Sequence, residues 1–381
     1  MRVNQASEIL DIATPELIEQ PIANGLDWNF SDHVANELDG IHPYPAKFIS
    51  EIPATLLDEF PRPDGLIVDP FCGSGTTLVQ SQNRNFRGVG IDLNPIACLI
   101  SRVKTYPLPP NAEDCLEKVI DATNIATAKV PLIPRLNHWF EEGVQKEIAA
   151  LIKSIESTPN ELHDVFNLAL SSIIVRVSNQ ESDTRYAAVK KKRSEGDVPL
   201  LFKKAATRII KILRQRNYDH PLIKVIEANT LKFDFKSLNE SVAAVITSPP
   251  YPNAYEYWLY HKYRMYWLGY DPQMVKQEEI GARAHFFKKN HHTADDFVRQ
   301  MTQTISSISE VLAKNGYAAF VVGRSKIHGE IVDNAQIIED VGHRLGLRVE
   351  YRSERRIAPT RKSFNLTHAN IKTETIVILT P

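Results

Sequence analysis

The chain has 381 residues, 43% of them hydrophobic, which is enough to bury a sizeable core. Its 45 Lys and Arg almost balance 46 Asp and Glu, and a net charge of −1 excludes a protein that binds nucleic acid through overall basicity. The sequence has no apolar run long enough to span a membrane, and its three cysteines lack the C-x-x-C spacing of a zinc site or a disulfide framework. We therefore expect a cytoplasmic protein without a membrane partner or a bound metal.

Six short runs rich in Val and Ile, each closed by a turn signal, predict buried strands at 66–70, 88–93, 224–229, 243–250, 318–324 and 374–381. Several of them are separated by amphipathic segments of helical length. This alternation is typical of a mostly parallel sheet that is covered by helices on both faces. The sequence therefore predicts an α/β fold with a doubly wound sheet.

The sequence DPFCGSGTT at 69–77 follows the first predicted strand and precedes a segment of helical character. Gly73 and Gly75 allow the backbone to turn tightly and approach a ligand, and the helix N-terminus offers unpaired N–H groups. Asp92 ends the next predicted strand, where an acid accepts hydrogen bonds from ribose hydroxyls in doubly wound folds. These features predict a site for an adenosine cofactor, and Leu78, which stands in place of a third glycine, weighs against a dehydrogenase.

Between the second and third predicted strands, residues 105–222 show helical periodicity over a stretch too long for a loop, so we expect an inserted helical subdomain. From 185 to 216 this region carries eleven Lys or Arg and two acids, a density typical of phosphate contact, although a solvated helix face is the alternative. Two further basic segments, 284–292 and 351–362, are weaker candidates. The residues that we expect to contact nucleic acid are Arg185, Lys190, Lys191, Lys192 and Arg193.

The sequence TSPPY at 247–251 ends the fourth predicted strand. Pro249 and Pro250 cannot extend a strand ladder, so they fix a stiff loop whose carbonyl groups point out of the sheet. These carbonyls and the Ser248 hydroxyl can accept hydrogen bonds from an amino group, and the ring of Tyr251 offers a face for a planar base. We expect Ser248, Pro249, Pro250 and Tyr251 to be the catalytic residues.

Together these motifs resemble those of the S-adenosylmethionine-dependent DNA amino-methyltransferases, which act in restriction-modification systems or alone. DPFCGSGTT is similar to their cofactor motif, GIDLNP (90–95) to their acid-bearing motif and TSPPY to their catalytic motif. GIHPYPAKF (40–48) resembles an N-terminal element that closes over the cofactor, and VIEANTLKF (225–233) resembles their third-strand motif. In this family SPPY is most frequent in cytosine-N4 enzymes, and DPPY or NPPY in adenine-N6 enzymes.

The resemblance implies a Rossmann-like methyltransferase sheet, S-adenosylmethionine as the cofactor, and methyl transfer to N4 of a flipped cytosine in double-stranded DNA. It implies an N-terminal element and cofactor-binding half at 1–104, a helical insertion at 105–222 that contacts DNA or only braces the fold, and a catalytic half at 223–381. A prokaryotic or phage setting and a cognate restriction endonuclease are further expectations. The expected cofactor residues are Lys47, Phe48, Asp69, Phe71, Gly73, Gly75, Thr76, Thr77, Asp92 and Asn229.

The reaction chemistry separates this family from a neighbouring one. Methylation of cytosine carbon 5 needs a thiolate nucleophile, which that family presents after a proline, and none of Cys72, Cys98 and Cys115 follows a proline. Methylation of an amino nitrogen needs no covalent intermediate, because acceptors draw the nitrogen toward sp³ and align it with the sulfonium methyl group. Adenine N6 in DNA, an RNA amino group and a protein glutamine amide stay open as targets, as does a non-catalytic DNA-binding module.

Overall fold

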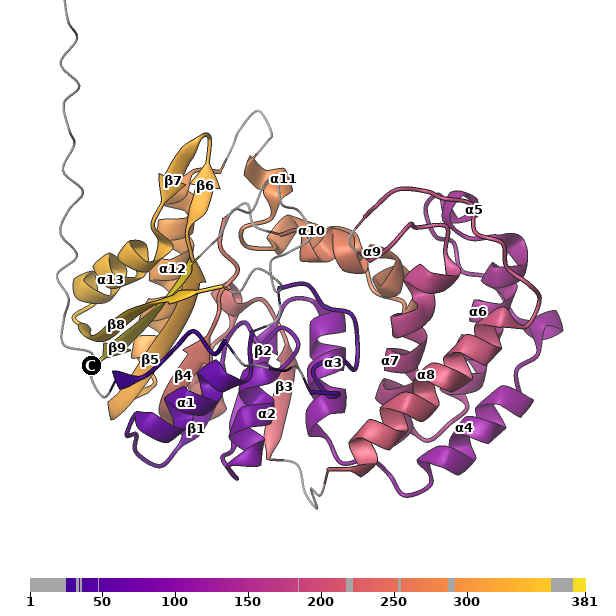
Figure 1. The fold of residues 1–381 in the computed structure, drawn as a ribbon, viewed down its shortest axis with the longest axis horizontal. Coiled ribbons are helices and arrows are strands. Elements are labelled where there is room, and N and C mark those ends of the chain that lie inside the picture. The colour runs from indigo at the N-terminus through magenta and orange to yellow at the C-terminus, as the bar shows by residue number, and fades with distance from the viewer. Residues whose placement is uncertain are drawn as a thin grey trace, which may run out of the picture.

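One sheet of seven strands forms the centre of the molecule (Figure 1). The computed structural model describes residues 25–31, 34, 36–46, 48–183, 185–216, 222–252, 255–286, 292–357 and 373–381. The strands are β1 (Leu66–Asp69), β2 (Gly88–Asp92), β3 (Ile223–Glu227), β4 (Val242–Thr247), β5 (Leu312–Gly323), β8 (Arg348–Arg356) and β9 (Thr373–Thr380). Their order in the sheet is β3-β2-β1-β4-β5-β9-β8. The first five run parallel, and β9 is antiparallel to both of its neighbours.

All six predicted strands are present, and three more were not predicted. β8 lies at an edge of the sheet and has the sequence RVEYRSERR, in which charged residues dominate, so it lacks the apolar run of a buried strand. A separate small hairpin joins β6 (Ser325–Ile327) and β7 (Glu330–Val332), which are too short to show periodicity. The sequence therefore predicted the strands with apolar runs and missed a charged edge strand and two strands of three residues.

Five helices cover the sheet: α1 (Glu51–Glu59), α2 (Thr76–Asn83), α3 (Pro95–Thr105), α12 (Ala294–Ser309) and α13 (Asn334–Arg344). Successive strand residues point to opposite faces. Ile67 and Ile246 pack into a cluster with α1 on one face, and Val68 and Val245 pack with α12 and α13 on the other. In Figure 1, α1 and α2 lie on the near side of the sheet. The predicted doubly wound α/β fold is confirmed.

Five helices between β2 and β3 form the helical subdomain: α4 (Ala112–Asp121), α5 (Leu136–Trp139), α6 (Glu142–Glu156), α7 (Asn160–Val177) and α8 (Asp197–Arg214). Figure 1 shows them stacked beside α3. Their core also includes Leu99 and Val103 of α3, and Tyr263 and Trp267 of α9 (Tyr257–Trp267). The helical subdomain is therefore packed onto the sheet through one helix from each half of the chain.

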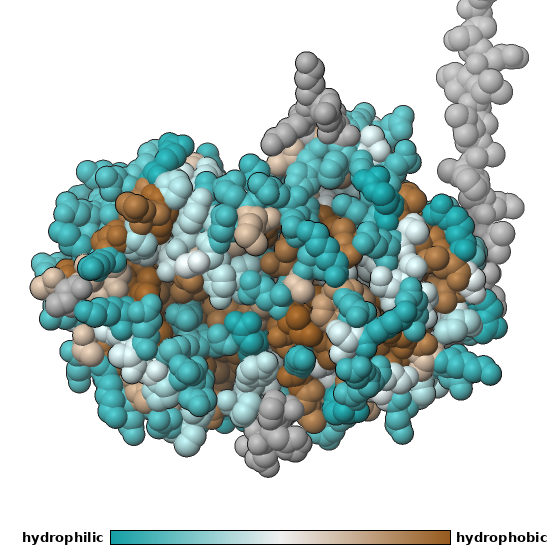
Figure 2. Space-filling view, turned by 180° about the vertical axis from the view of Figure 1, so that it is seen from behind, coloured by the Kyte–Doolittle hydropathy of each residue, from teal (hydrophilic) through white to brown (hydrophobic). Residues whose placement is uncertain are grey.

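Short helices complete the connections after β3 and β4: η3 (Thr230–Lys232), η4 (Phe235–Leu238), α10 (Pro272–Glu278) and α11 (Arg283–Phe286). Seen from behind, hydrophilic residues cover most of the molecule, and hydrophobic residues show between them mainly across the middle (Figure 2). None of the helices in the described part of the chain is long and apolar enough to cross a membrane.

Candidate active site

The carboxyl ends of β1 and β4 lie side by side where the strand order reverses. From β1 the chain continues outward through β2 and β3, and β4 then returns to the other side of β1. In doubly wound folds, ligands bind beyond the strand ends at such a reversal. The Thr247 hydroxyl donates a hydrogen bond of 2.7 Å to the Asp69 carboxylate. The first residues of the predicted cofactor and catalytic motifs therefore meet at this point.

The turn after β1, here called the glycine turn (residues 70–75), depends on two left-handed glycines. Gly73 has φ +49° and Gly75 has φ +79°, a region that other L residues rarely adopt. A Cβ at Gly73 would lie 3.3 Å from the Tyr44 hydroxyl, and one at Gly75 would lie 2.7 Å from the Ser101 hydroxyl. Gly75 is the N-cap of α2 and has no side chain to cap it, so acceptors on a ligand can meet the first N–H groups of that helix.

Asp92 braces the glycine turn from the end of β2. One carboxylate oxygen accepts from the Gly73 N–H at 2.8 Å, and the other accepts from the Asn94 N–H at 2.8 Å. Asn94 in turn caps α3 by accepting from the Ile96 N–H, with Pro95 at the first helical position. Each Asp92 oxygen has more than one lone pair and the side chain is only half-buried, so it can still accept from ribose hydroxyls.

Three acids surround the glycine turn, and none of them forms an ion pair with a Lys or Arg in the described part of the chain. Burial raises the pKa of Asp69 to about 6 and the pKa of Asp92 to about 6. Burial, with repulsion from Glu256 and Asp92, raises the pKa of Glu279 to about 8. Glu279 accepts from backbone N–H groups at the start of α9, and no motif in the sequence pointed to it. Asp69 and Asp92 accept hydrogen bonds but have no cation beside them in the described part of the chain, so their carboxylates favour a ligand that carries a positive charge.

The SPPY loop (residues 248–251) presents an acceptor beside the glycine turn. The Ser248 hydroxyl donates to the Val321 carbonyl of β5 at 2.9 Å. Because its single proton is used in this bond, its oxygen is left as an acceptor. At the other end of the loop, the backbone of Gly281 packs closely against the Tyr251 carbonyl. Gly281 has φ +71°, and a Cβ on it would lie 2.7 Å from the Tyr251 carbonyl oxygen. Tyr251 itself is partly buried.

The segment that resembles a closing element, residues 40–48, reaches the glycine turn through Tyr44. The Tyr44 ring stacks on Tyr257 at 5.7 Å and on His261 at 5.3 Å, both from α9. Phe48 packs instead into the hydrophobic cluster beneath α1. Lys47 lies outside the described residues. Tyr44 was not among the expected cofactor residues, and its place within the GIHPYPAKF motif was the one available signal for it.

The remaining expected cofactor residues also have structural contacts. Phe71 is partly buried against the cluster beneath α12 and α13. Thr76 and Thr77 are buried in the first turn of α2, and the Thr77 hydroxyl donates to a backbone carbonyl of β4 at 3.2 Å. Asn229 caps η3 and donates to the Glu278 carboxylate at 2.8 Å. These side chains frame the strand ends whether or not they touch a ligand.

The residues expected to contact DNA lie on a short hairpin and the segment after it, residues 179–193, here called the basic hairpin. One antiparallel bridge joins its two arms. Arg185, Lys190 and Lys192 are exposed, and Arg185 forms an ion pair with Glu181 at 2.9 Å. The three side chains are therefore accessible to solvent, and their expected contact with DNA stays a prediction.

Two cations of the basic hairpin have a structural role at the end of α7. The Lys191 ammonium donates to the Val175 carbonyl at 3.1 Å, and the Arg193 guanidinium donates to the Arg176 carbonyl. Cations at the C-terminal end of a helix satisfy its free carbonyls and interact favourably with its dipole. Lys191 and Arg193 therefore hold the basic hairpin on the subdomain.

Further along the basic run, charge is partly neutralised within the fold. Lys203 pairs with Glu117 at 2.6 Å, and Arg214 pairs with Glu113 at 2.6 Å. These two pairs fix α8 on α4. The other basic candidates, 284–292 and 351–362, lie only partly within the described residues.

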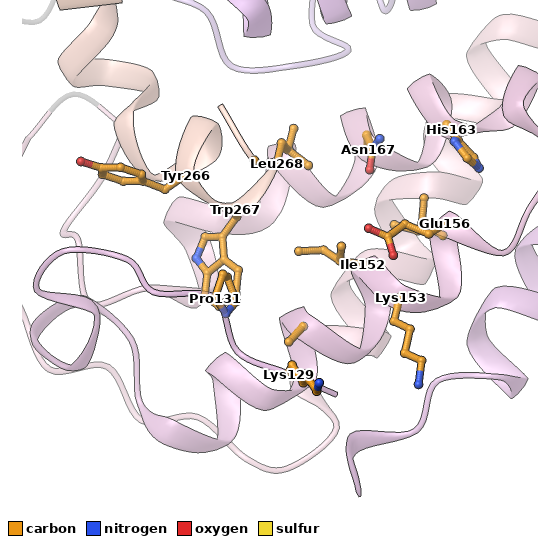
Figure 3. A pocket seen from close by; sticks show the side chains of 13 residues that line it. Lys129, Pro131, Ile152, Lys153, Glu156, His163, Asn167, Tyr266, Trp267 and Leu268 are labelled. Carbon is orange, nitrogen blue, oxygen red and sulfur yellow. The ribbon is translucent and has the colours of Figure 1, made fainter. Parts of the chain in front are cut away.

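A pocket of about 580 Å³ lies in the helical subdomain, apart from the strand ends (Figure 3). It lies among α6, α7 and the end of α9, which contribute Ile152, Glu156, His163, Asn167 and Trp267. None of the expected site residues lines it. The residues of the sequence motifs lie elsewhere, at the carboxyl ends of β1, β2 and β4.

Comparisons with known proteins match the same region. Residues 18–102, which include the 40–48 segment, the glycine turn and Asp92, match a family model described as DNA methylase.

The type II methyltransferase M.MjaII of Methanocaldococcus jannaschii is 38% identical over 92 residues, 23% of this chain and 17% of that protein. M.BsoBI of Geobacillus stearothermophilus is 25% identical over 64% of this chain and 55% of its own length. M.MvaI of Kocuria varians is 26% identical over 55% of this chain and 52% of its own length.

The chain thus spans about half the length of two of these relatives and a smaller share of the first. The expected DNA methylase resemblance and S-adenosylmethionine as cofactor agree with these matches.

The basic hairpin contains cations that cap α7 and cations that are exposed, and substitutions should affect the two groups differently. Replacing Lys191 and Arg193 with Gln should lower the free energy of unfolding by about 1 kcal/mol, because the end of α7 loses its cations. Replacing Lys190 and Lys192 with Gln should leave stability unchanged and weaken binding to duplex DNA. Urea unfolding and fluorescence anisotropy measure the two effects. Equal stability of both double variants would contradict the capping role.

Proposed function

We propose that this chain is an S-adenosylmethionine-dependent methyltransferase that methylates the N4 amino group of cytosine in double-stranded DNA. The observation that carries the proposal is the hydrogen bond between Thr247 and Asp69, which sets the Ser248 acceptor beside the glycine turn. The match of residues 18–102 to a DNA methylase model supports the DNA substrate. The type II methyltransferases among its relatives support a restriction-modification setting in a prokaryote or phage, with or without a cognate endonuclease.

The residues of the glycine turn fit the proposed cofactor. The bound cofactor supplies an electrophilic methyl group on a positively charged sulfonium. Asp69 and Asp92 carry negative charge above their pKa values of about 6, without an ion-pair partner among the described residues, and Asp92 keeps acceptor capacity for ribose hydroxyls. Glu279, with a pKa of about 8, is mostly protonated at neutral pH in the free protein and would ionise beside a cationic ligand. The absence of side chains at Gly73 and Gly75 lets the backbone lie close to a ligand. Tyr44 is positioned to cover the turn.

The SPPY loop would act on the amino group of the base. Its nitrogen lone pair is conjugated with the ring, so it becomes a nucleophile when acceptors favour a pyramidal geometry. The Ser248 oxygen and the Pro249 carbonyl would accept its two N–H bonds. Because Ser248 donates its own proton to Val321, it cannot compete as a donor to the base. The proton that the amino group releases after transfer would leave through Ser248 or a water molecule.

The target base would be flipped out of the duplex to reach this loop. An amino group engaged in base pairing cannot align with a methyl donor, and enzymes that act on bases extrude them at a cost of a few kcal/mol. Tyr251 is partly buried in the same loop as Ser248 and packs against the cluster beneath α12 and α13, and its ring would offer a stacking face that returns part of this cost. The SPPY sequence supports cytosine, and an adenine target would use the same acceptors.

The role of Ser248 can be tested directly. Ser248→Ala should slow methyl transfer in single-turnover experiments by about 100-fold, the scale of one lost preorganised hydrogen bond in a transition state. Affinities for cofactor and DNA should change little, because the bond matters most as the nitrogen becomes pyramidal. Ser237→Ala, an exposed serine on η4, is the matched control and should behave as the unaltered protein. Full activity of Ser248→Ala would place the catalytic loop elsewhere.

The acids around the glycine turn predict a pH dependence of cofactor binding. A cationic ligand favours ionised carboxylates, and the pKa values of Asp69 and Asp92 are both about 6 in the free protein. Affinity for S-adenosylmethionine should therefore fall as the pH drops below about 6, because these two carboxylates take up protons, and should rise as the pH passes about 8, where Glu279 loses its proton. S-adenosylhomocysteine lacks the sulfonium charge and should show a weaker dependence in the same calorimetric titration. Identical pH profiles for the two ligands would contradict the electrostatic role of these acids.

A further inference from the structure

We propose that Arg135, Lys262 and Lys276 form a second DNA-contacting site, here called the α9 cation cluster, which binds backbone phosphates between the active site and the basic hairpin. The inference rests on the proposed function and concerns how the DNA lies across the protein. None of these three residues stood out in the sequence, because they are isolated cations in three separate segments.

The α9 cation cluster is assembled around two aromatic rings of α9. The Lys276 ammonium lies 4.7 Å from the centre of the Trp258 ring, and the Lys262 ammonium lies 5.9 Å from the same ring. Lys262 also lies 5.7 Å from the Tyr263 ring, whose hydroxyl donates to the Pro134 carbonyl next to Arg135. These cation–π contacts hold the two ammonium groups near the same ring, and an ammonium group has three N–H donors.

The charges of the α9 cation cluster are not balanced within the fold. In the described part of the chain, none of the three cations forms an ion pair with a carboxylate, unlike Lys203 and Arg214 of the basic run. Burial, followed by repulsion from Lys276 and Arg135, lowers the pKa of Lys262. Cations kept this close together without an acid favour an external anion. A phosphate backbone supplies anions at regular spacing.

Acids near the cluster are engaged elsewhere. Glu279 accepts from the N–H groups at the start of α9, and Glu278 on α10 pairs with Lys232 at 2.6 Å. Glu181 of the basic hairpin pairs with Arg185 at 2.9 Å. These contacts keep the three carboxylates from neutralising the α9 cation cluster.

The position of the cluster fits DNA whose target base reaches the SPPY loop. α9 begins at Tyr257, which stacks on Tyr44 over the glycine turn. Lys262 is five residues further, about 8 Å along the helix at roughly 1.5 Å per residue. Beyond it, the Tyr263 ring stacks at 6.5 Å on Tyr186 of the basic hairpin.

Figure 1 shows α9 running from the strand ends toward α5, the helix that Arg135 precedes. The cluster would therefore lie between the SPPY loop, which the proposed function assigns to the target base, and the basic hairpin, whose exposed cations we expect to contact the DNA backbone. DNA that follows this path would meet cations along its whole length.

The test is the salt dependence of binding to a fluorescein-labelled, mixed-sequence DNA duplex. The triple variant Arg135→Gln, Lys262→Gln, Lys276→Gln should lower the slope of log affinity against log salt by about 2 to 3 units, because each phosphate contact adds about 0.9. The matched control is Lys224→Gln, Lys314→Gln, Arg348→Gln, which removes two exposed lysines and one arginine near the amino ends of β3, β5 and β8. Its slope should equal that of the unaltered protein.

The outcomes separate this inference from the proposed function. If the unaltered protein binds and methylates DNA and the triple variant keeps its slope, the α9 cation cluster is not a phosphate site and the proposed function stands. If the unaltered protein does not bind the duplex, both fail. Lysine acetylation of the unaltered protein gives a second measurement that needs no variant to fold: DNA should protect Lys262 and Lys276 and leave Lys224 and Lys314 reactive. Equal modification with and without DNA would overturn the inference.

Discussion

The hydrogen bond from the Thr247 hydroxyl to the buried Asp69 carboxylate is the contact on which the site depends. It joins the ends of two neighbouring parallel strands, so the glycine turn and the SPPY loop both begin at this contact. Asp69 is buried and must have donors, which it finds in Thr247 and in the Phe71 N–H at 3.1 Å. The position of the Ser248 acceptor relative to the glycine turn follows from this pair.

Acids and cations gather in different regions of the fold, which explains how a chain of net charge −1 could bind both a cationic cofactor and an anionic polymer. Carboxylates gather at the strand ends, where burial raises their pKa values and a positive ligand would lower them again. Cations gather in the α9 cation cluster and on the basic hairpin. The charges of these two regions nearly cancel in the net charge of the whole chain, so the separation of positive and negative charge becomes apparent only in the folded structure.

Much of the fold could be predicted from the sequence because its central strands β1, β2 and β4 are buried on both faces and the turns after β1 and β4 carry glycine or proline. The two motifs were located correctly at the strand ends, since a loop with Gly73 and Gly75 or with Pro249 and Pro250 has few other uses there. The edge strand β8 was missed because its exposed face is polar.

Residues that act through tertiary contacts had no local signal. Glu279 is one acid after an ordinary helix, and its raised pKa comes from burial that only the fold creates. Lys191 and Arg193 look like surface cations in the sequence, yet they cap α7. Lys262 and Lys276 become neighbours only because both approach the Trp258 ring. Such residues depend on distances between segments, which periodicity and motif spacing do not contain.

The most direct test of the account is the identity of the modified nucleoside. Genomic DNA from a methylation-free bacterial host that expresses the chain should contain N4-methylcytosine when it is digested to nucleosides and analysed by mass spectrometry. DNA from the same host expressing Ser248→Ala should contain far less. N6-methyladenine in place of N4-methylcytosine would contradict the proposed base, and unmodified DNA from a host that produces folded protein would contradict DNA methylation itself.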